Sequence, residues 1–234
     1  MRFVRIIGPG RAGHSFANAL AGAGLRVELM ERPAPVRNAA ADADVVLVAT
    51  PDRVIAQIAR EIEPGPAVVL HCSGATGLAP LSMHERHGSI HPLMALPNAT
   101  TGAARLAENG WFAVAGHAMA NELVDALGGR SFVVSDENRA LYHATAAVSA
   151  NHLVALLAQV ERLAEQVGVP AEAFFDLARG SFDDVVAQGA RAALTGPAAR
   201  GDQATLDAHR AALPGPERAL YDALVVAASA LGRQ

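Results

Sequence analysis

The chain has 234 residues, 51% of them hydrophobic and 18% charged, which is enough apolar sequence to bury a substantial core. Its net charge is −4 and no basic stripe is present, so nucleic acid is not an expected partner. All 19 basic residues are arginine, which excludes lysine general bases, Schiff bases and the lysine of a phosphate-binding P-loop. One cysteine, Cys72, excludes an internal disulfide and favours a cytoplasmic location, and no apolar run suggests a membrane span or a signal peptide.

A glycine-rich turn follows the first apolar run (residues 3–7) and precedes a segment with helical spacing (15–20). The turn consists of Gly8, Pro9, Gly10, Arg11, Ala12 and Gly13. Gly8 permits a tight turn, Gly10 lets the backbone approach a pyrophosphate, and Gly13 lets the helix pack closely on the strand. The helix start then presents free N–H groups to the anion. The pattern predicts binding of NAD or NADP, and the alternative is a turn that keeps this shape without a ligand.

A second predicted strand, residues 25–30, ends at Glu31 and Arg32. Glu31 lies near the position where an acidic residue binds the adenine ribose of NAD. Arg32 and Arg37 can instead hold the 2′-phosphate of NADP, and a solvated strand end is a third interpretation. Only about a dozen residues precede the next strand, so any helix in this crossover has one or two turns.

Two further predicted strands, 45–49 and 67–71, end in polar turns. Thr50 and Pro51 follow the first, before a helix over 53–62, and either line the nicotinamide ribose or simply start the helix. Ser73 lies in a loop of small residues after the second, and either contacts a substrate carboxylate or carbonyl or belongs to an ordinary turn. Because ligands bind at the carboxyl ends of parallel strands, we expect these turns to face one crevice.

His91 follows a short predicted strand and precedes Pro92, and it is the best candidate for proton transfer, since histidine exchanges protons near neutral pH. We expect it to face the same crevice as Ser73. Cys72 is a poor candidate nucleophile because no base accompanies it. The histidines His84, His87 and His91 lack metal-ligand spacing, and no metal site is expected.

The alternation of strands and helices ends near residue 134. We interpret 97–110 as a loop, 111–115 as a strand, 118–127 as a helix and 131–134 as a strand. Helices are expected at 137–167, 171–177, 182–194, 202–212 and 216–231. The predicted fold class is α/β. It comprises an N-terminal Rossmann-like dinucleotide-binding domain with a mostly parallel sheet (1–135) and an all-helical C-terminal domain (136–234), whose long helix must bury its apolar faces against neighbouring helices or another chain.

The helical half contains polar residues among alanines. His143 and Asn151 lie within about 80° of each other on a helical wheel and are expected to reach a substrate from the helical side. A buried asparagine that holds helices in register is an equally good interpretation of Asn151. Arg200, before a helix capped by Asp202, is a candidate anchor for a substrate carboxylate, or part of an ordinary capped surface helix.

Together these motifs resemble a family of bacterial Rossmann-like proteins of unassigned activity whose C-terminal helical domain is similar to that of 6-phosphogluconate dehydrogenase. The matching pieces are the Gly8 to Gly13 turn, Ala49-Thr50-Pro51-Asp52, Ser73-Gly74-Ala75-Thr76-Gly77, His91-Pro92-Leu93, Tyr142-His143-Ala144, Asn151-His152, Leu194-Thr195-Gly196-Pro197 and Arg200-Gly201-Asp202. The resemblance implies NAD or NADP as cofactor and a homodimer formed through the helical domain. It implies no particular substrate.

A more distant resemblance is to prephenate and arogenate dehydrogenases, in which a strand-end serine and a His-Pro motif face the substrate. Ser73 and His91 occupy similar places. The sequence departs from these families in its short second crossover and in lacking a counterpart to the catalytic lysine of hydroxyacid dehydrogenases. The sequence therefore predicts an NAD(P)-dependent oxidoreductase acting on a small carbonyl, imine or alcohol. The alternatives are a non-catalytic dinucleotide-binding or scaffold dimer, and a substrate-binding module without a cofactor.

Overall fold

The computed structural model describes residues 1–31 and 35–233. The chain forms two compact units, Met1–Ala150 and Asn151–Gln234. The division lies beyond the expected boundary at 135/136. Residue 135 marks the end of the strand and helix alternation, whereas the next helical turns remain tied to the first unit by side-chain contacts. The predicted phosphate-binding role of Arg32 lies outside the described residues.

In the described part of the first unit, seven strands form one sheet in the order β2-β1-β3-β4-β5-β6-β7. The strands are β1 Phe3–Ile7, β2 Arg26–Met30, β3 Val45–Val48, β4 Val68–His71, β5 His87–Pro92, β6 Trp111–Gly116 and β7 Arg130–Val133. Neighbouring strands are parallel except β5 and β6, which are antiparallel. The prediction of an α/β Rossmann-like fold with a mostly parallel sheet is confirmed.

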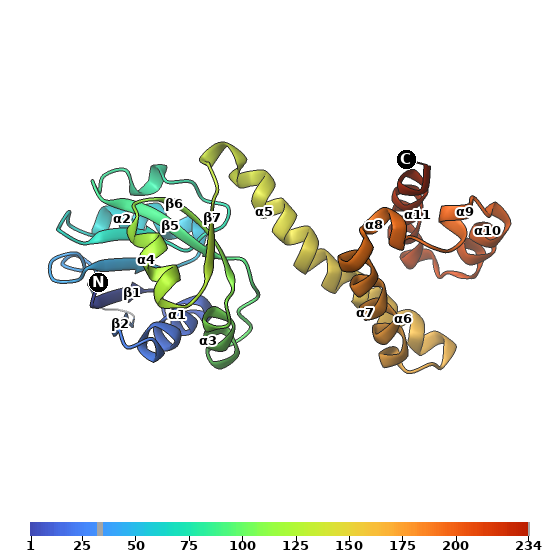
Figure 1. Ribbon diagram of the computed structural model, residues 1–234, viewed down its shortest axis with the longest axis horizontal. Helices are drawn as coiled ribbons and strands as arrows, with labels where there is room; N and C mark the ends of the chain where they lie inside the picture. The colour runs from blue at the N-terminus through green and yellow to red at the C-terminus, as the bar shows by residue number, and fades with distance from the viewer. Residues whose placement is uncertain (32–34, 234) are drawn as a thin grey trace. The chain divides into compact units, whose positions relative to one another are not determined.

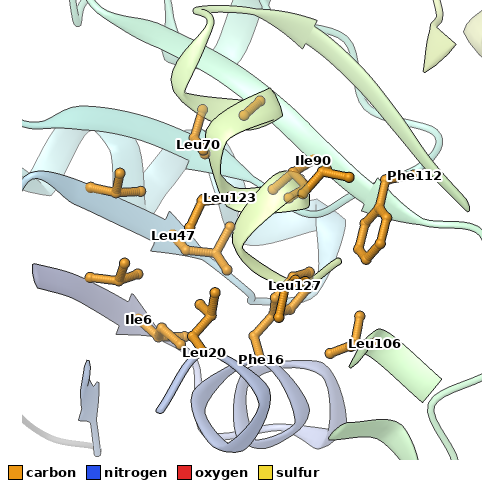
Figure 2. Packing of buried hydrophobic residues seen from close by; sticks show 14 of the residues in the cluster. Ile6, Phe16, Leu20, Leu47, Leu70, Ile90, Leu106, Phe112, Leu123 and Leu127 are labelled. Carbon is orange, nitrogen blue, oxygen red and sulfur yellow. The ribbon is translucent and has the colours of Figure 1, made fainter. Parts of the chain in front are cut away.

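Successive residues of a strand point to opposite sides of the sheet, so the apolar strands present side chains on both faces. Helices cover both faces and bury these side chains in two clusters. One face packs on α1 (Arg11–Gly22), α3 (Ala99–Ala107) and α4 (Met119–Ala126). Figure 2 shows Phe16 and Leu20 of α1 and Leu123 of α4 in one cluster with Ile6 and Leu47 of the strands. The other face packs on α2 (Asp52–Glu61), the short 3₁₀ helix η1 (Ala79–Leu81) and the turn at 36–43. Both faces are buried, which explains the continuous apolar strands.

The expectation of a loop at 97–110 is wrong, because α3 lies within it. Asn98 caps this helix by accepting a hydrogen bond from the Thr101 amide at 2.8 Å. The helix packs against α1 (Figure 1), and a Cβ at Gly102 would lie 2.1 Å from Ser15 Oγ, so glycine is needed for the close approach. The signal missed in the sequence was the capping asparagine.

The helices after β7 differ from the prediction in two ways. The expected helix at 137–167 is a 3₁₀ turn η2 (Asp136–Asn138), α5 (Arg139–Ala147), a π-helical turn η3 (Val148–His152) and α6 (Leu153–Val167). The expected helices at 171–177 and 182–194 are one helix, α7 (Ala171–Gln188), followed by α8 (Ala190–Ala193). Gly180 lies inside α7 without interrupting it, because a single glycine in a helix interior costs only about 1 kcal/mol relative to alanine. The remaining elements are α9 (Pro197–Arg200), α10 (Gln203–Ala212), η4 (Gly215–Glu217) and α11 (Arg218–Arg233).

The second unit has little core of its own. Among its residues whose burial the structure describes, Gln159, Ala164 and Leu206 are buried, whereas Val154, Phe182 and Val186 are more than 60% exposed. By length and composition alone the helical stretch 136–167 could cross a membrane, with a mean hydropathy of 1.2, although the sequence suggested no such run. A single stretch of this kind is weak grounds for a membrane location, and its first turns contact the sheet unit.

Candidate functional site

The glycine turn between β1 and α1 has the geometry that its three glycines require. Gly8 has a φ of +115°, and a Cβ there would lie 2.6 Å from the carbonyl oxygen of Ala49. A Cβ at Gly13 would lie 1.9 Å from the carbonyl oxygen of Gly8, so α1 starts against the turn itself. A Cβ at Gly10 would meet nothing within 4 Å. The backbone of Gly10 thus borders open space, as a pyrophosphate site needs.

The start of α1 provides the donors for an anion. The helix begins at Arg11, and its N-cap residue Gly10 makes no side-chain capping bond. The first N–H groups of a helix have no intrahelical partner, and the positive end of the helix dipole lies at the same place. The backbone of residues 11–13 is therefore suited to bind phosphate oxygens.

A cleft of about 320 Å³ lies beside the turn on the β2 side. Gly8, Pro9 and Glu31 line it, together with Thr50 from the end of β3. Glu61 contributes a second carboxylate. Arg37, the alternative partner of a 2′-phosphate, is exposed and hydrogen-bonded to Glu63, with Nε 2.7 Å from the carboxylate oxygen.

A second cleft of about 440 Å³ lies over the carboxyl ends of β3, β4 and β5. The parallel strands bring these ends to one edge, as the sequence predicted. The lining includes predicted residues from each segment: Gly10, Arg11, Ala12, Thr50, Pro51, Ser73 and His91. Thr50 lines both clefts, and its buried Oγ1 has no hydrogen-bond partner among the described residues.

The Ser73 hydroxyl has its hydrogen-bonding capacity filled by the protein. It donates to Asp52 Oδ2 at 2.7 Å and accepts from the amides of Ala75 and Thr76 at 3.2 and 2.9 Å. The Thr76 hydroxyl lies 2.9 Å away. Ser73 therefore fixes its own loop and orients the Asp52 carboxylate, which also lines the second cleft.

The buried side chain of His71 is hydrogen-bonded to both ends of this loop. The amide of Ser73 donates to His71 Nδ1 at 3.3 Å, so Nε2 carries the proton and donates to the Gly77 carbonyl at 3.1 Å. Burial lowers the pKa of His71 to about 4, which keeps the ring neutral at physiological pH. Beside it, burial and the Asp52 carboxylate raise the pKa of the Cys72 thiol to about 12, so Cys72 is a poor nucleophile.

His91 lies in the second cleft and is paired with a tyrosine from α5. Its Nδ1 lies 2.6 Å from the hydroxyl oxygen of Tyr142, and the two rings meet edge to face. Burial lowers the pKa of His91 to about 4, with further contributions from His143 and Arg139. Burial also raises the pKa of Tyr142 to about 12. Both groups are therefore neutral near pH 7.

Arg139 holds the start of α5 on the sheet, a role that the sequence analysis missed. Its side chain is only 2% exposed, and Nη2 donates to Ser89 Oγ at 2.9 Å. Its Nη1 lies 3.5 Å from the Ser73 carbonyl, and Nε lies 3.3 Å from Asp136 Oδ1. The sequence signal for this role was the three-residue spacing of Arg139 and Tyr142, which places both side chains on one face of the helix.

Asn151 and Arg200 belong to the second unit. Asn151 is exposed within η3, and Arg200 is exposed at the end of α9, before Gly201 with its φ of +69°. Asp202 caps α10 by accepting from the Thr205 amide at 3.2 Å. The roles expected for Asn151 and Arg200 in substrate binding remain predictions.

The chain resembles known proteins in part of its sequence and in its fold. The family described as a domain of unknown function, DUF2520, matches residues 113–228, which confirms the resemblance to a family of unassigned activity. No curated protein matches the sequence. Protein TM1727 from Thermotoga maritima is 21% identical over 98% of each chain, with a TM-score of 0.75.

Two further solved structures share the fold over nearly the whole chain. BF3122, a proposed NADP oxidoreductase from Bacteroides fragilis, is 18% identical over 97% of this chain and 98% of that one, with a TM-score of 0.80. A reductive aminase from Aspergillus terreus, solved with NADPH, cyclohexanone and allyl amine, is 16% identical over 100% of this chain and 95% of that one, with a TM-score of 0.74.

Proposed function

We propose that this chain, whose residues 113–228 match the DUF2520 family, is an NAD(P)-dependent oxidoreductase acting on a small carbonyl, imine or alcohol. The observation that carries the proposal is the uncapped start of α1 between two clefts that share Thr50. A dinucleotide needs this arrangement: a phosphate site with a nucleoside site on each side. The fold shared with BF3122 and the reductive aminase supports the same class of reaction.

The residues present fit such a cofactor. The open space beside Gly10 can hold a phosphate group, and a side chain at this position would fill it. The Thr50 hydroxyl has no hydrogen-bond partner among the described residues and is available to a ribose. In this proposal the backbone of 8–13 binds the pyrophosphate and Glu31 binds the adenine ribose. Pro51 and Thr50 border the nicotinamide side. When bound, the cofactor donates or accepts a hydride, and His91 exchanges the accompanying proton with the substrate.

Ser73 positions the substrate indirectly in this proposal, because its hydroxyl is already occupied and it holds the Asp52 carboxylate at the cleft. Asn151 and Arg200 are the candidate polar groups of the helical unit, and the guanidinium of Arg200 is suited to an anionic substrate group. The scarcity of buried residues in that unit supports a homodimer, since an isolated unit with so small a core is not expected to be stable. Sedimentation or light scattering at several concentrations tests the dimer, and a stable monomer would exclude it.

Fluorescence titration with NADH and NADPH tests cofactor binding. We expect the protein to bind NADH more tightly than NADPH. The carboxylates of Glu31 and Glu61 line the first cleft and would repel the negatively charged 2′-phosphate of NADPH. Gly10→Val should abolish binding without unfolding the protein, since its φ of −88° and open surroundings accept a side chain. Gly22→Val, at the far end of the same helix, is the matched control. Unchanged affinity in Gly10→Val would remove the turn from the site.

A turnover assay distinguishes an oxidoreductase from a non-catalytic dinucleotide-binding dimer. Incubation with NADH or NADPH and a panel of ketones, imines and 2-oxo acids should reveal oxidation of the cofactor, and His91→Ala should reduce turnover far more than cofactor affinity. Equal loss of both would indicate a structural histidine. Tight nucleotide binding with no oxidation across the panel would instead favour a non-catalytic dinucleotide-binding dimer.

A further inference from the structure

Tyr142 is the hydrogen-bonding partner of His91. The two side chains come from α5 and β5, and their polar atoms lie 2.6 Å apart. The ring of Tyr142 also meets Phe132 of β7 edge to face, with centroids 5.8 Å apart, so the phenol is held on both sides. The hydroxyl group is thereby fixed at Nδ1 of His91.

The direction of this hydrogen bond follows from the two groups. The pyridine-type nitrogen of a neutral imidazole is a better acceptor than a phenol oxygen, and the phenol is the better donor. No other acceptor for the Tyr142 hydroxyl is present among the described residues. Tyr142 therefore donates to Nδ1, which places the remaining ring hydrogen of His91 on Nε2.

Nε2 faces the second cleft through the gap left by a glycine. A Cβ at Gly74 would lie 2.7 Å from His91 Nε2 and 2.9 Å from His143 Cδ2. Gly74, His91 and His143 all line the cleft. Because Gly74 has no side chain, the Nε2 hydrogen is accessible to a substrate atom in that space.

The charges around His91 disfavour an imidazolium ion. Arg139, His143 and His71 oppose a positive charge on the ring, Asp52 alone favours it, and burial opposes it most. His91 is neutral near pH 7, so it cannot act as a preformed imidazolium acid. A neutral imidazole can lose its Nε2 proton only if Nδ1 gains one at the same time.

We propose that Tyr142 is the proton source of the site and that His91 relays its proton to the substrate. This inference depends on the proposed oxidoreductase activity. In the reducing direction the substrate carbon gains a hydride from the nicotinamide, and its oxygen or nitrogen takes the proton of His91 Nε2. The Tyr142 proton moves to Nδ1, so His91 ends as the other neutral tautomer. Tyr142 is left as a phenolate, which regains a proton from solvent because its side chain is partly exposed. The oxidising direction reverses each transfer.

The ring tautomer of His91 tests this relay without any substrate. In ¹⁵N-labelled protein at pH 7, histidine side-chain correlation spectra should show His91 protonated at Nε2 and unprotonated at Nδ1, with His91→Asn assigning the signals. Tyr142→Phe keeps the ring contacts but removes the donor, and should shift the tautomer ratio by about tenfold, the size expected for one hydrogen bond. The control is Tyr221→Phe, which removes the hydroxyl 3.0 Å from His209 Nδ1 in the second unit and should leave His91 unchanged.

A charged His91, a proton on Nδ1, or an unchanged ratio in Tyr142→Phe would overturn the relay. These outcomes leave nucleotide binding untouched, so they are distinguishable from failure of the proposed function. In the turnover assay described above, Tyr142→Phe should lower kcat by about 10²-fold or more with little change in KM, as for loss of proton transfer. A Tyr142→Phe enzyme with wild-type kcat would also overturn the proposal.

Discussion

Two glycines in α1 should respond to alanine in opposite directions. Gly13 and Gly22 lie in the same helix, and alanine favours a helix interior over glycine by about 1 kcal/mol. At Gly22 a Cβ meets nothing within 4 Å, so Gly22→Ala should stabilise the protein by up to about 1 kcal/mol. The effect of alanine at Gly13 depends on whether a methyl group fits between α1 and the Gly8 to Gly13 turn.

At Gly13 the added methyl group would lie 1.9 Å from the Gly8 carbonyl oxygen and 3.1 Å from its carbon. Ordinary contact begins near 3.4 Å, so α1 must move away from the turn by more than 1 Å. Both obstacles are backbone atoms, and no side-chain rotation relieves them. Overpacking of this kind costs about 1–3 kcal/mol, which outweighs the helical gain. Gly13→Ala should therefore be destabilised by roughly 1–2 kcal/mol or more.

Urea unfolding followed by the fluorescence of Trp111, the single tryptophan, reports on the sheet unit. Gly13→Ala should lower the midpoint and weaken nucleotide binding, because the phosphate-binding amides move with α1. Gly22→Ala should raise the midpoint slightly and leave binding unchanged. A Gly13→Ala protein as stable as Gly22→Ala would refute the reasoning about close helix packing.

Three other predictions concern buried groups below and beside the second cleft. Burial lowers the pKa of His71 to about 4 from about 6.5 in an unfolded chain, so only the unfolded chain binds the proton between these pH values. His71 should therefore contribute about 3 kcal/mol to the fall in the free energy of unfolding between pH 6.5 and 4, measured by urea titration as the difference between the wild type and His71→Asn, and the same pH dependence in both proteins would contradict this. Because burial raises the pKa of Cys72 to about 12, iodoacetamide at pH 8 should alkylate it far more slowly in native protein than in urea; equal rates would show an accessible thiolate. Arg139→Met should lower stability by about 1–3 kcal/mol in the Trp111 assay, since Ser89 loses its partner, and wild-type stability would show that Arg139 is dispensable.

The fold was largely predictable because its signals are local. Continuous apolar strands, the Gly8 to Gly13 turn and Pro51 at a helix start each depend on neighbouring residues, and the sheet formed as expected. The helix α3 was missed because its small and β-branched residues carry a weak periodic signal. The π-helical turn was missed because it departs from the 3.6-residue period on which the helical wheel depends. The placement of Asn151 relative to His143 by that wheel therefore does not apply.

The candidate site was predictable only in its location. Strand ends placed Thr50, Ser73 and His91 at one edge, and the structure brings them together in the second cleft. The contacts that decide their chemistry join distant residues. The pair of His91 and Tyr142 is separated by 51 positions, and Arg139 reaches Ser89 across 50. No spacing rule identifies such partners, and no sequence pattern indicates that the Ser73 hydroxyl donates to the Asp52 carboxylate.

The distribution of buried residues between the two units also bears on how the protein is made. Nearly all of the buried apolar residues, from Phe3 to Val134, precede the helical unit in the chain. Proteins fold domain by domain during translation, beginning with the part that leaves the ribosome first. The sheet unit can thus mature while the rest of the chain is still being made, whereas in the proposed homodimer residues 151–234 are covered only once a second chain binds. At low synthesis rates, residues 151–234 should therefore be exposed to proteases for longer than the sheet unit.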